Sequence, residues 1–341
     1  MEENNKYRRK IRKVRGEEKM NTIVTGASGF IGSNLLKTLL EKGNRVIGID
    51  KDINKYYLIE DLCQDKLPSF GINFIDKNFN MIYDNINNIE QYAHAFSNVE
   101  IVYHLAASAD IRKSFKDPML DLENNVIGTN SVLELLRKRD IKNLVFSSSS
   151  SIYGITKVVP TPEDVPDIRP ISMYGASKLA NEAFISAYCD LYGIKAWVFR
   201  FANVVGRNQH RGVIFDFVKK LNDNQFELII LGDGNQEKSF FDVEDCVSGL
   251  LDIPKKDNNK SMEIYNLGNK ETMKVKDLAR IVCEEIGVSP EFKYTGGDRG
   301  WEGDTPYTIL SIQKALKVGW KPKYDCRESI KRTVRWLFEK G

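Results

Sequence analysis

The sequence lacks long hydrophobic runs, clustered histidines and paired cysteines. No stretch approaches the roughly 18 consecutive apolar residues of a membrane-spanning helix, and no N-terminal segment resembles a signal peptide. We therefore expect a protein that does not cross a membrane. The three histidines, His94, His104 and His210, are scattered and lack metal-ligand spacing, so we expect no metal site.

The cysteines are odd in number and form no CxxC pair. They are Cys63, Cys189, Cys246, Cys283 and Cys326. This usage is typical of free thiols in a reducing compartment, which favours a cytoplasmic protein. We expect them to be small buried apolar residues.

Positive charge is concentrated at the N-terminus. Residues 1–19 contain eight Lys or Arg and four Glu, a net charge of +4, whereas the whole chain carries +3. The remaining residues therefore carry −1 and offer no basic surface for nucleic acid. We expect residues 1–19 to be a disordered, dispensable tail; the alternative is a basic arm for an anionic surface.

The rest of the composition is that of a folded, enzyme-sized chain. Its 341 residues are too many for one ordinary core and fit two sub-domains. The chain is 42% hydrophobic and 28% charged, which argues against disorder, collagen and coiled coil.

From residue 20, short β-branched runs alternate with helical stretches. The predicted strands are Thr22–Thr25, Arg45–Asp50, Val99–Leu105, Asn143–Ser147 and Lys195–Phe201, and the predicted helices are Ser33–Lys42, Val126–Arg139 and Ala176–Leu191. This alternation predicts an α/β fold with a doubly wound, Rossmann-type parallel sheet. Beyond residue 204, shorter segments rich in Gly, Asp and Asn predict a smaller mixed α/β lobe that ends in a helix at Arg327–Glu339.

Three glycines at GxxGxxG spacing follow the first predicted strand and open a helix. Gly26 permits a tight turn, Gly29 lets the backbone approach a pyrophosphate, and Gly32 lets the helix pack on the strand. Asp50 ends the next strand, where a carboxylate accepts hydrogen bonds from the adenosine ribose and repels a 2′-phosphate. The sequence therefore predicts NAD rather than NADP, bound by a domain spanning residues 20–203.

Tyr and Lys occur at i, i+4 spacing in two places. A phenol with a pKa of about 10 becomes a usable base beside a lysine ammonium and the positive nicotinamide. The pair Tyr153 and Lys157 runs into a proline-rich segment, whereas Lys178 is followed by fourteen residues without Pro or Gly. Helical context therefore favours Tyr174 and Lys178 as the catalytic pair.

Five consecutive serines, Ser147–Ser151, stand at the end of a predicted strand. Ligands of open α/β sheets bind at such strand ends, so a serine hydroxyl there is placed to contact a substrate oxygen. The alternative is a solvated serine-rich turn.

The order of these motifs resembles the extended short-chain dehydrogenase/reductase family, in particular its UDP-glucose 4-epimerase-like enzymes. Matching stretches over residues 20–341 include TGASGFIGSNL, VYHLAA, FSSSSSIYG, YGASKLANE and GDRGWEGDTP. The resemblance implies an NAD-dependent isomerase that interconverts UDP-glucose and UDP-galactose by transient C4 oxidation, rotation of the 4-keto sugar and hydride return. A dehydratase, decarboxylase or NADP-linked reductase of the same family is the alternative, and a catalytically inactive NAD-binding protein is a third.

The resemblance also implies roles for single residues. The cofactor would contact Gly26, Gly29, Phe30, Ile31, Gly32, Asp50, Asp76, Leu105, Ala106 and Ala107, with Asp76 at the adenine. The catalytic residues would be Ser149, Tyr174 as the base, and Lys178, which also binds the nicotinamide ribose. The substrate would contact Ser149, Asn203, Lys238, Arg299 and Thr308. Lys238 stands where the family usually has Arg, and a lysine offers a point charge instead of a bidentate fork.

Two further comparisons with the family concern the expected reaction and the expected substrate. Dehydratases and decarboxylases carry a carboxylate just after the catalytic hydroxyl, whereas this chain has Ser150 and Ser151, which favours epimerisation. Thr308 would lie beside the sugar C2 substituent, and a small residue there predicts room for an N-acetyl group. The resemblance also implies a homodimer through helices 126–139 and 176–191, and a substrate lobe over 204–341 with segments near 240–265 returning to the first domain.

Overall fold

The central sheet contains eight strands in the order β12-β7-β6-β5-β1-β2-β4-β3, and all neighbouring pairs are parallel except β3 with β4. The computed structural model describes residues 19–63, 68–256 and 260–340, so the tail predicted at residues 1–19 lies almost wholly outside the described residues. The strands are β1 (Asn21–Thr25), β2 (Arg45–Asp50), β3 (Gly71–Phe74), β4 (Phe79–Tyr83), β5 (Ile101–His104), β6 (Asn143–Ser149), β7 (Lys195–Phe201) and β12 (Met262–Leu267).

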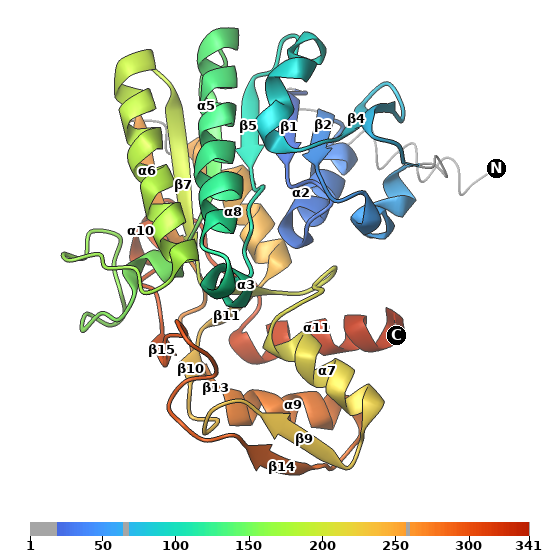
Figure 1. Cartoon of the computed structure of the whole chain (residues 1–341), viewed down its shortest axis with the longest axis vertical. Helices are drawn as coiled ribbons and strands as arrows, with labels where there is room; N and C mark the ends of the chain where they lie inside the picture. The colour runs from blue at the N-terminus through green and yellow to red at the C-terminus, as the bar shows by residue number, and fades with distance from the viewer. Residues whose placement is uncertain (1–18, 64–67, 257–259, 341) are drawn as a thin grey trace.

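Helices cover both faces of this sheet (Figure 1). One face packs against α2 (Phe30–Glu41), α8 (Val243–Lys256) and α10 (Gln313–Lys317); the other packs against η3 (Ile86–Ala95), α5 (Gly128–Arg139) and α6 (Met173–Tyr192). Successive strand residues point to opposite faces, so Ile23 and Val24 of β1 belong to different hydrophobic cores. The predicted doubly wound α/β fold is confirmed.

A smaller part, at the bottom of Figure 1, has its own hydrophobic core. It contains α7 (Val213–Asp223), α9 (Val275–Ile286), α11 (Cys326–Lys340), and the paired strands β9 (Glu227–Ile230) and β14 (Glu291–Tyr294). Between the two parts lie β8 (Asn203–Val205) paired with β11 (Phe240–Asp242), and the sheet of β10 (Glu237–Lys238), β13 (Met273–Lys274) and β15 (Tyr307–Thr308). Strand β12 returns the chain to the central sheet.

Helix α6 begins three residues earlier than predicted. Ser172 caps it, since the Ser172 hydroxyl accepts a hydrogen bond from the Gly175 N–H at 3.1 Å. Tyr174 therefore lies in the first helical turn. The helix ends at Gly193, which adopts the left-handed conformation that glycine tolerates.

Strands β3 and β4 were not predicted, because asparagines interrupt the apolar pattern of both segments. Helix α5 is preceded by a π-helical segment, η4 (Leu122–Ile127), so regular α-helix starts two residues later than predicted. None of the helices in the described part of the chain is long and apolar enough to cross a membrane.

Candidate active site

The glycine-rich turn after β1 has no space for side chains. Gly26 has a φ of +69°, and a Cβ on Gly32 would lie 2.0 Å from the Gly26 carbonyl oxygen. That oxygen also accepts a hydrogen bond from the Gly29 N–H at 2.9 Å. The turn lines a cavity of about 250 Å³, together with the residues after β5 that were also predicted to contact a cofactor. These residues are Gly26, Gly29, Phe30, Ile31, Gly32, Leu105, Ala106 and Ala107.

Asp50 lies in the same cavity at the carboxyl end of β2. Its two carboxylate oxygens accept hydrogen bonds from the backbone N–H groups of Ser28 and Asp52, each at 3.0 Å. Burial raises the pKa of Asp50, and these two hydrogen bonds oppose that effect. The carboxylate is thereby fixed in place where a ribose hydroxyl can donate to it.

The structure does not bring Asp76 to this cavity. Its carboxylate accepts hydrogen bonds from the N–H groups of Asn78 and Phe79, at 2.6 and 2.8 Å, and so stabilises the turn between β3 and β4. Asp84 and Asn85, which follow β4 beside Asp50, line the cavity instead. The Asp76 expectation fails because β4 was not predicted, and a carboxylate after an unrecognised strand could not be placed.

A buried network supports the loop that follows β5. Thr25 accepts hydrogen bonds on its hydroxyl from the N–H groups of Leu105 and Ala106, at 3.2 and 3.1 Å. The His104 ring lies between the hydroxyls of Thr25 and Thr129, at 2.7 and 3.0 Å. Burial, with the Lys178 charge adding to it, lowers the pKa of His104 to about 3. His104 is therefore a neutral structural residue beneath the cavity.

Helix α6 carries Tyr174 and Lys178, and both line the cavity. The Lys178 Nζ donates to the Ser147 carbonyl at 2.7 Å and lies 5.9 Å from the centroid of the Tyr174 ring. Burial lowers the pKa of Lys178 to about 7, while the charges of Asp121 and Glu182 raise it. The lysine charge is thus sensitive to its carboxylate neighbours at neutral pH.

Ser149 stands between two groups of lining residues. Its neighbours Ser147 and Ser148 line the 250 Å³ cavity, and Ser150 and Ser151 line a second one of about 350 Å³. The Ser149 hydroxyl accepts from the Ser151 N–H at 3.1 Å. The last serines of the run therefore lie at a junction of the two cavities.

Burial raises the pKa of the Tyr174 phenol. The charge of Arg211 and a hydrogen bond with the Ser149 hydroxyl act in the opposite direction. Arg211 lines both cavities. Among the described residues, none forms an ion pair with its guanidinium.

Tyr153, the tyrosine of the second Tyr/Lys pair in the sequence, is hydrogen-bonded within a buried ion-pair network. Arg200 donates to both carboxylate oxygens of Glu182, at 3.0 and 2.6 Å, and to the Tyr153 hydroxyl at 2.9 Å. That hydroxyl in turn donates to Asn266 at 2.7 Å. Lys157 lies in an exposed loop, so this pair shares neither a helix face nor a cavity.

The 350 Å³ cavity also takes residues from the smaller part of the molecule. Asn203 and Thr308, both predicted to contact substrate, line it. The Asn203 side-chain amide donates to the Ser239 carbonyl at 3.0 Å. Thr308 shares a hydrogen bond with the Thr305 hydroxyl at 2.8 Å.

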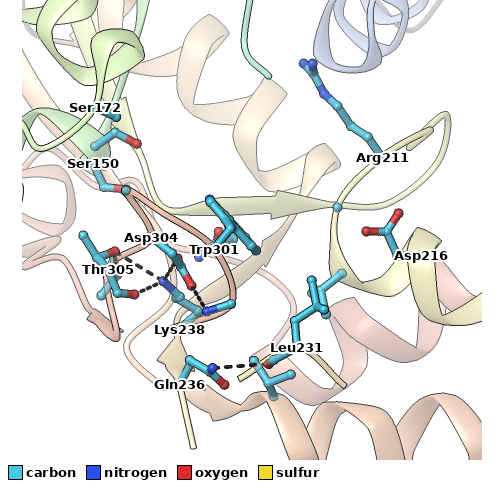
Figure 2. Close-up of a pocket in the computed structure, with 18 of the residues that line it drawn as sticks. Ser150, Ser172, Arg211, Asp216, Leu231, Gln236, Lys238, Trp301, Asp304 and Thr305 are labelled. Carbon is cyan, nitrogen blue, oxygen red and sulfur yellow. Dashed lines mark hydrogen bonds and ion pairs between the residues drawn. The ribbon is translucent and has the colours of Figure 1, made fainter. Parts of the chain in front are cut away.

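Lys238 lines this cavity with its ammonium already bonded. Nζ donates to the Asp304 carboxylate at 2.8 Å, to the Thr305 carbonyl and to the Thr305 hydroxyl (Figure 2). An ammonium has three donors, so none is left for a phosphate while this cluster persists. Arg299 is absent from the described residues that line the cavity, and its Nε lies 3.9 Å from Asp298. The substrate contacts of Lys238 and Arg299 therefore stay predictions, with the Lys238 ammonium bonded within the protein and Arg299 outside the residues that line the cavity.

Comparison with known proteins decides the family. Residues 22–268 match the model of the NAD dependent epimerase/dehydratase family. The chain belongs to this family.

Similarity to individual relatives extends over nearly the whole length of the chain. The chain is 37% identical to a provisionally named UDP-glucose 4-epimerase of Methanocaldococcus jannaschii, over 92% of this chain and 97% of that protein. Its structure is similar to the UDP-glucose 4-epimerase of Thermotoga maritima with UDP-glucose, at 30% identity, coverage of 94% and 99%, and a TM-score of 0.81. It is also similar to the UDP-glucuronic acid 4-epimerase of Bacillus cereus in complex with UDP-glucuronic acid and NAD, at 26% identity, coverage of 94% and 100%, and a TM-score of 0.82.

The chain is thus an enzyme of the NAD-dependent sugar-nucleotide epimerase family, and the resemblance drawn from its motifs is confirmed. The 250 Å³ cavity fits NAD as the family's cofactor: its glycine turn admits a pyrophosphate only because no Cβ is present, and Asp50 offers a carboxylate to the ribose. Asp84, Asn85 and Arg211 are among the lining residues that the sequence did not predict. A prediction of β4 would have found the first two, but nothing in the local sequence marks Arg211.

Proposed function

We propose that this enzyme is a 4-epimerase of UDP-hexoses, which interconverts UDP-glucose with UDP-galactose and also accepts the N-acetylated pair. The observation that carries the proposal is that Tyr174 and Lys178 line the 250 Å³ cavity together, with Lys178 hydrogen-bonded to the start of the serine run, whose Ser150 and Ser151 line the 350 Å³ cavity. Beside them, Ser150 and Ser151 occupy the places where an eliminating enzyme would need a carboxylate.

The reaction uses Tyr174 as the base for the sugar 4-hydroxyl. Ser149, whose hydroxyl acts to lower the pKa of the Tyr174 phenol, orients the same oxygen. Lys178 supplies positive charge that favours the phenolate. NAD, when bound, supplies the reversible two-electron oxidation of the sugar carbon and a positive nicotinamide. The proton that Tyr174 takes in the forward direction returns to the 4-hydroxyl at the end, so no net proton or redox change results.

The substrate nucleotide occupies the 350 Å³ cavity in this proposal. Asn203, which lines this cavity, contacts the diphosphate in this proposal, and Lys238 holds Asp304 and Thr305 instead of touching phosphate. Thr308 is small and lies in the lining of the cavity, which supports room for an N-acetyl group at C2. Turnover of UDP-galactose without any conversion of UDP-N-acetylgalactosamine would contradict the role of Thr308.

We test the function by proton NMR of the NAD-loaded enzyme mixed with UDP-galactose. The proposal predicts that UDP-glucose appears and that the same ratio is reached from either sugar, with no added cofactor consumed. Tyr174→Phe should lose most activity while its thermal stability and NAD content stay near wild type. Wild-type turnover in that variant would overturn the assignment of the base.

A second candidate, UDP-glucuronate 4-epimerase, is favoured by one observation. The Arg211 guanidinium lines both cavities and, in Figure 2, projects away from the Lys238 cluster. A sugar carboxylate would give it a bidentate partner. UDP-glucuronate in a parallel NMR tube decides between them: preferred turnover that Arg211→Gln abolishes selects this candidate, and preferred turnover of UDP-galactose excludes it.

We also propose a homodimer through α5 and α6, which lie side by side through hydrogen bonds from Tyr188 to Asn130 and Glu134. Phe184 and Leu191 flank Tyr188 on α6 and are 44% and 71% exposed. Leu191→Lys should therefore give a monomer in light scattering. The matched control is Phe226→Lys, at an exposed apolar residue outside these helices, and monomer formation by both variants or by neither would contradict this interface.

A further inference from the structure

The charge of Lys178 has to be balanced inside the protein. Its side chain is among the largest fully buried ones, and within the described residues its Nζ makes one hydrogen bond, to the neutral carbonyl of Ser147. A buried ammonium without a compensating carboxylate loses its proton. Two buried carboxylates lie close enough to Lys178 to affect it, Asp121 and Glu182.

Glu182, one helical turn further along α6, already has a cation of its own. Both of its oxygens accept hydrogen bonds from Arg200, and one also accepts from the Ser148 hydroxyl. This bidentate pair is buried on both sides. The negative charge of Glu182 is therefore balanced by Arg200, which leaves little of it for Lys178.

Asp121 has no such partner. It ends α4 (Met119–Asp121), is 0% exposed, and is in no ion pair with any described residue within 4 Å. One carboxylate oxygen accepts a hydrogen bond from the Asn125 amide at 3.2 Å, and the other oxygen is buried with no hydrogen-bond partner in the described chain. The Asn125 amide also donates to Ser177, the residue before Lys178, at 2.9 Å. Asp121 is therefore a buried, uncompensated carboxylate tied to the helix that carries Lys178.

We propose that Asp121 is the counter-charge of Lys178 and acts as a positioning residue that keeps this ammonium charged at neutral pH. The proposal rests on the proposed catalytic role of Lys178. It assigns a function to a carboxylate that lines neither cavity and so touches neither substrate nor cofactor.

The electrostatics around the lysine agree with this assignment. Burial lowers the pKa of Lys178 to about 7, and Asp121 is the larger of the two charges that raise it. Burial raises the pKa of Asp121, whereas the Ser114 hydroxyl and, after it, the charge of Lys178 lower it. The other titratable or charged groups around the pair are Tyr174, His104, which is neutral, Glu182, which Arg200 balances, and Arg211, which acts on Tyr174.

The decisive experiment measures the protonation of Lys178 directly. Protein labelled with ¹³C-lysine is titrated by NMR, and the Lys178 ε-carbon resonance is assigned by its disappearance in Lys178→Met. We expect Asp121→Asn to lower the midpoint by about one pH unit or more, because removing an adjacent opposite charge has an effect of that size. Asp121→Glu, which keeps the carboxylate, should restore the Lys178 midpoint to near its wild-type value.

The matched control is Asp245→Asn, which alters another buried carboxylate, one that accepts backbone hydrogen bonds from Lys323 and Tyr324. It should leave the Lys178 midpoint and the activity profile unchanged. An unchanged midpoint in folded Asp121→Asn, or an equal shift in Asp245→Asn, would overturn the proposal. If Asp121→Asn does not fold, Asp121→Ser decides instead, since it also removes the carboxylate charge and must lower the Lys178 midpoint if the proposal holds.

The pH dependence of catalysis gives a second readout on the NAD-loaded enzyme. The limb of the kcat profile that reports loss of the lysine proton should move to lower pH in Asp121→Asn. A uniform loss of activity at all pH values would show a merely structural role through Asn125 and would contradict the proposal. If the wild type converts no UDP-hexose at all, the proposed function fails, and the NMR titration still decides the role of Asp121.

Discussion

A single methyl group on Gly32 tests how the glycine turn holds the cofactor. Gly32 lies in the first turn of α2, and a Cβ there would be 2.0 Å from the Gly26 carbonyl oxygen and 3.1 Å from the Ala27 Cα. Both neighbours are backbone atoms, so no side chain can rotate away. Gly32→Ala must therefore displace either the turn or the start of the helix.

The size of the effect follows from these distances. Ordinary van der Waals contact begins at 3.4 Å, so the Cβ and the carbonyl oxygen have to separate by roughly 1.4 Å. Overpacking of this kind costs about 1–3 kcal/mol, and where NAD binding requires the original turn, that cost corresponds to a rise in Kd of about 5- to 150-fold. We expect the Kd for NAD to rise about 30- to 100-fold in Gly32→Ala.

The assay is isothermal titration of NAD into cofactor-free protein, alongside thermal unfolding. Gly29→Ala is the matched control within the same turn, because its Cβ would lie 3.0 Å from the same oxygen and demands a shift of only a few tenths of an ångström. Its Kd should rise by less than that of Gly32→Ala. If Gly32→Ala binds NAD within threefold of wild type, or if Gly29→Ala is the worse variant, the backbone contact does not control binding and the reasoning is refuted.

Three further predictions follow from buried charges. Arg200→Leu leaves the Glu182 carboxylate without its cation and should lower the free energy of unfolding by about 3–5 kcal/mol in urea denaturation. The double variant with Glu182→Leu should recover part of this loss, and a double variant less stable than Arg200→Leu would contradict the pairing. Lys238→Met removes the cation of the buried Asp304 and loosens its loop, so KM for the sugar nucleotide should rise while kcat changes little; a collapse of kcat with unchanged KM would place Lys238 in the chemistry instead. Because burial lowers the pKa of Lys178 from 10.5 to about 7, the unfolded chain binds more protons between those values, and the stability of the cofactor-free protein gains a contribution that rises with pH across that window. Lys178→Met should flatten this slope by up to about 1.4 kcal/mol per pH unit, and an unchanged slope in unfolding measured from pH 7 to 10 would argue against a depressed lysine pKa.

The predictable part of the fold is the part with strong local patterns. Strand β7 and strand β2 have the predicted bounds, and α6 was placed within three residues because its apolar run lacks breakers. Strands β3 and β4 were missed because asparagines interrupt the apolar pattern of these two strands at the edge of the sheet. As a consequence, Asp76 and not Asp84 was predicted to contact the cofactor. Such errors arise where tertiary pairing overrides weak local preference.

Local sequence is enough to specify the glycine turn, Asp50 at the end of β2, and the helical context of Tyr174, which Tyr153 lacks. These features depend on residues that are neighbours in the chain, whose backbone conformation and helix spacing are local properties. Which charged groups keep free hydrogen-bond donors or unbalanced charge depends on the tertiary structure. The Lys238 ammonium is bonded to residues more than sixty positions away, Glu182 is paired with the strand residue Arg200, and the charge of Asp121 acts on Lys178. Burial and distant neighbours set the protonation of a group and the number of its free hydrogen-bond donors, and only the folded chain brings those neighbours together.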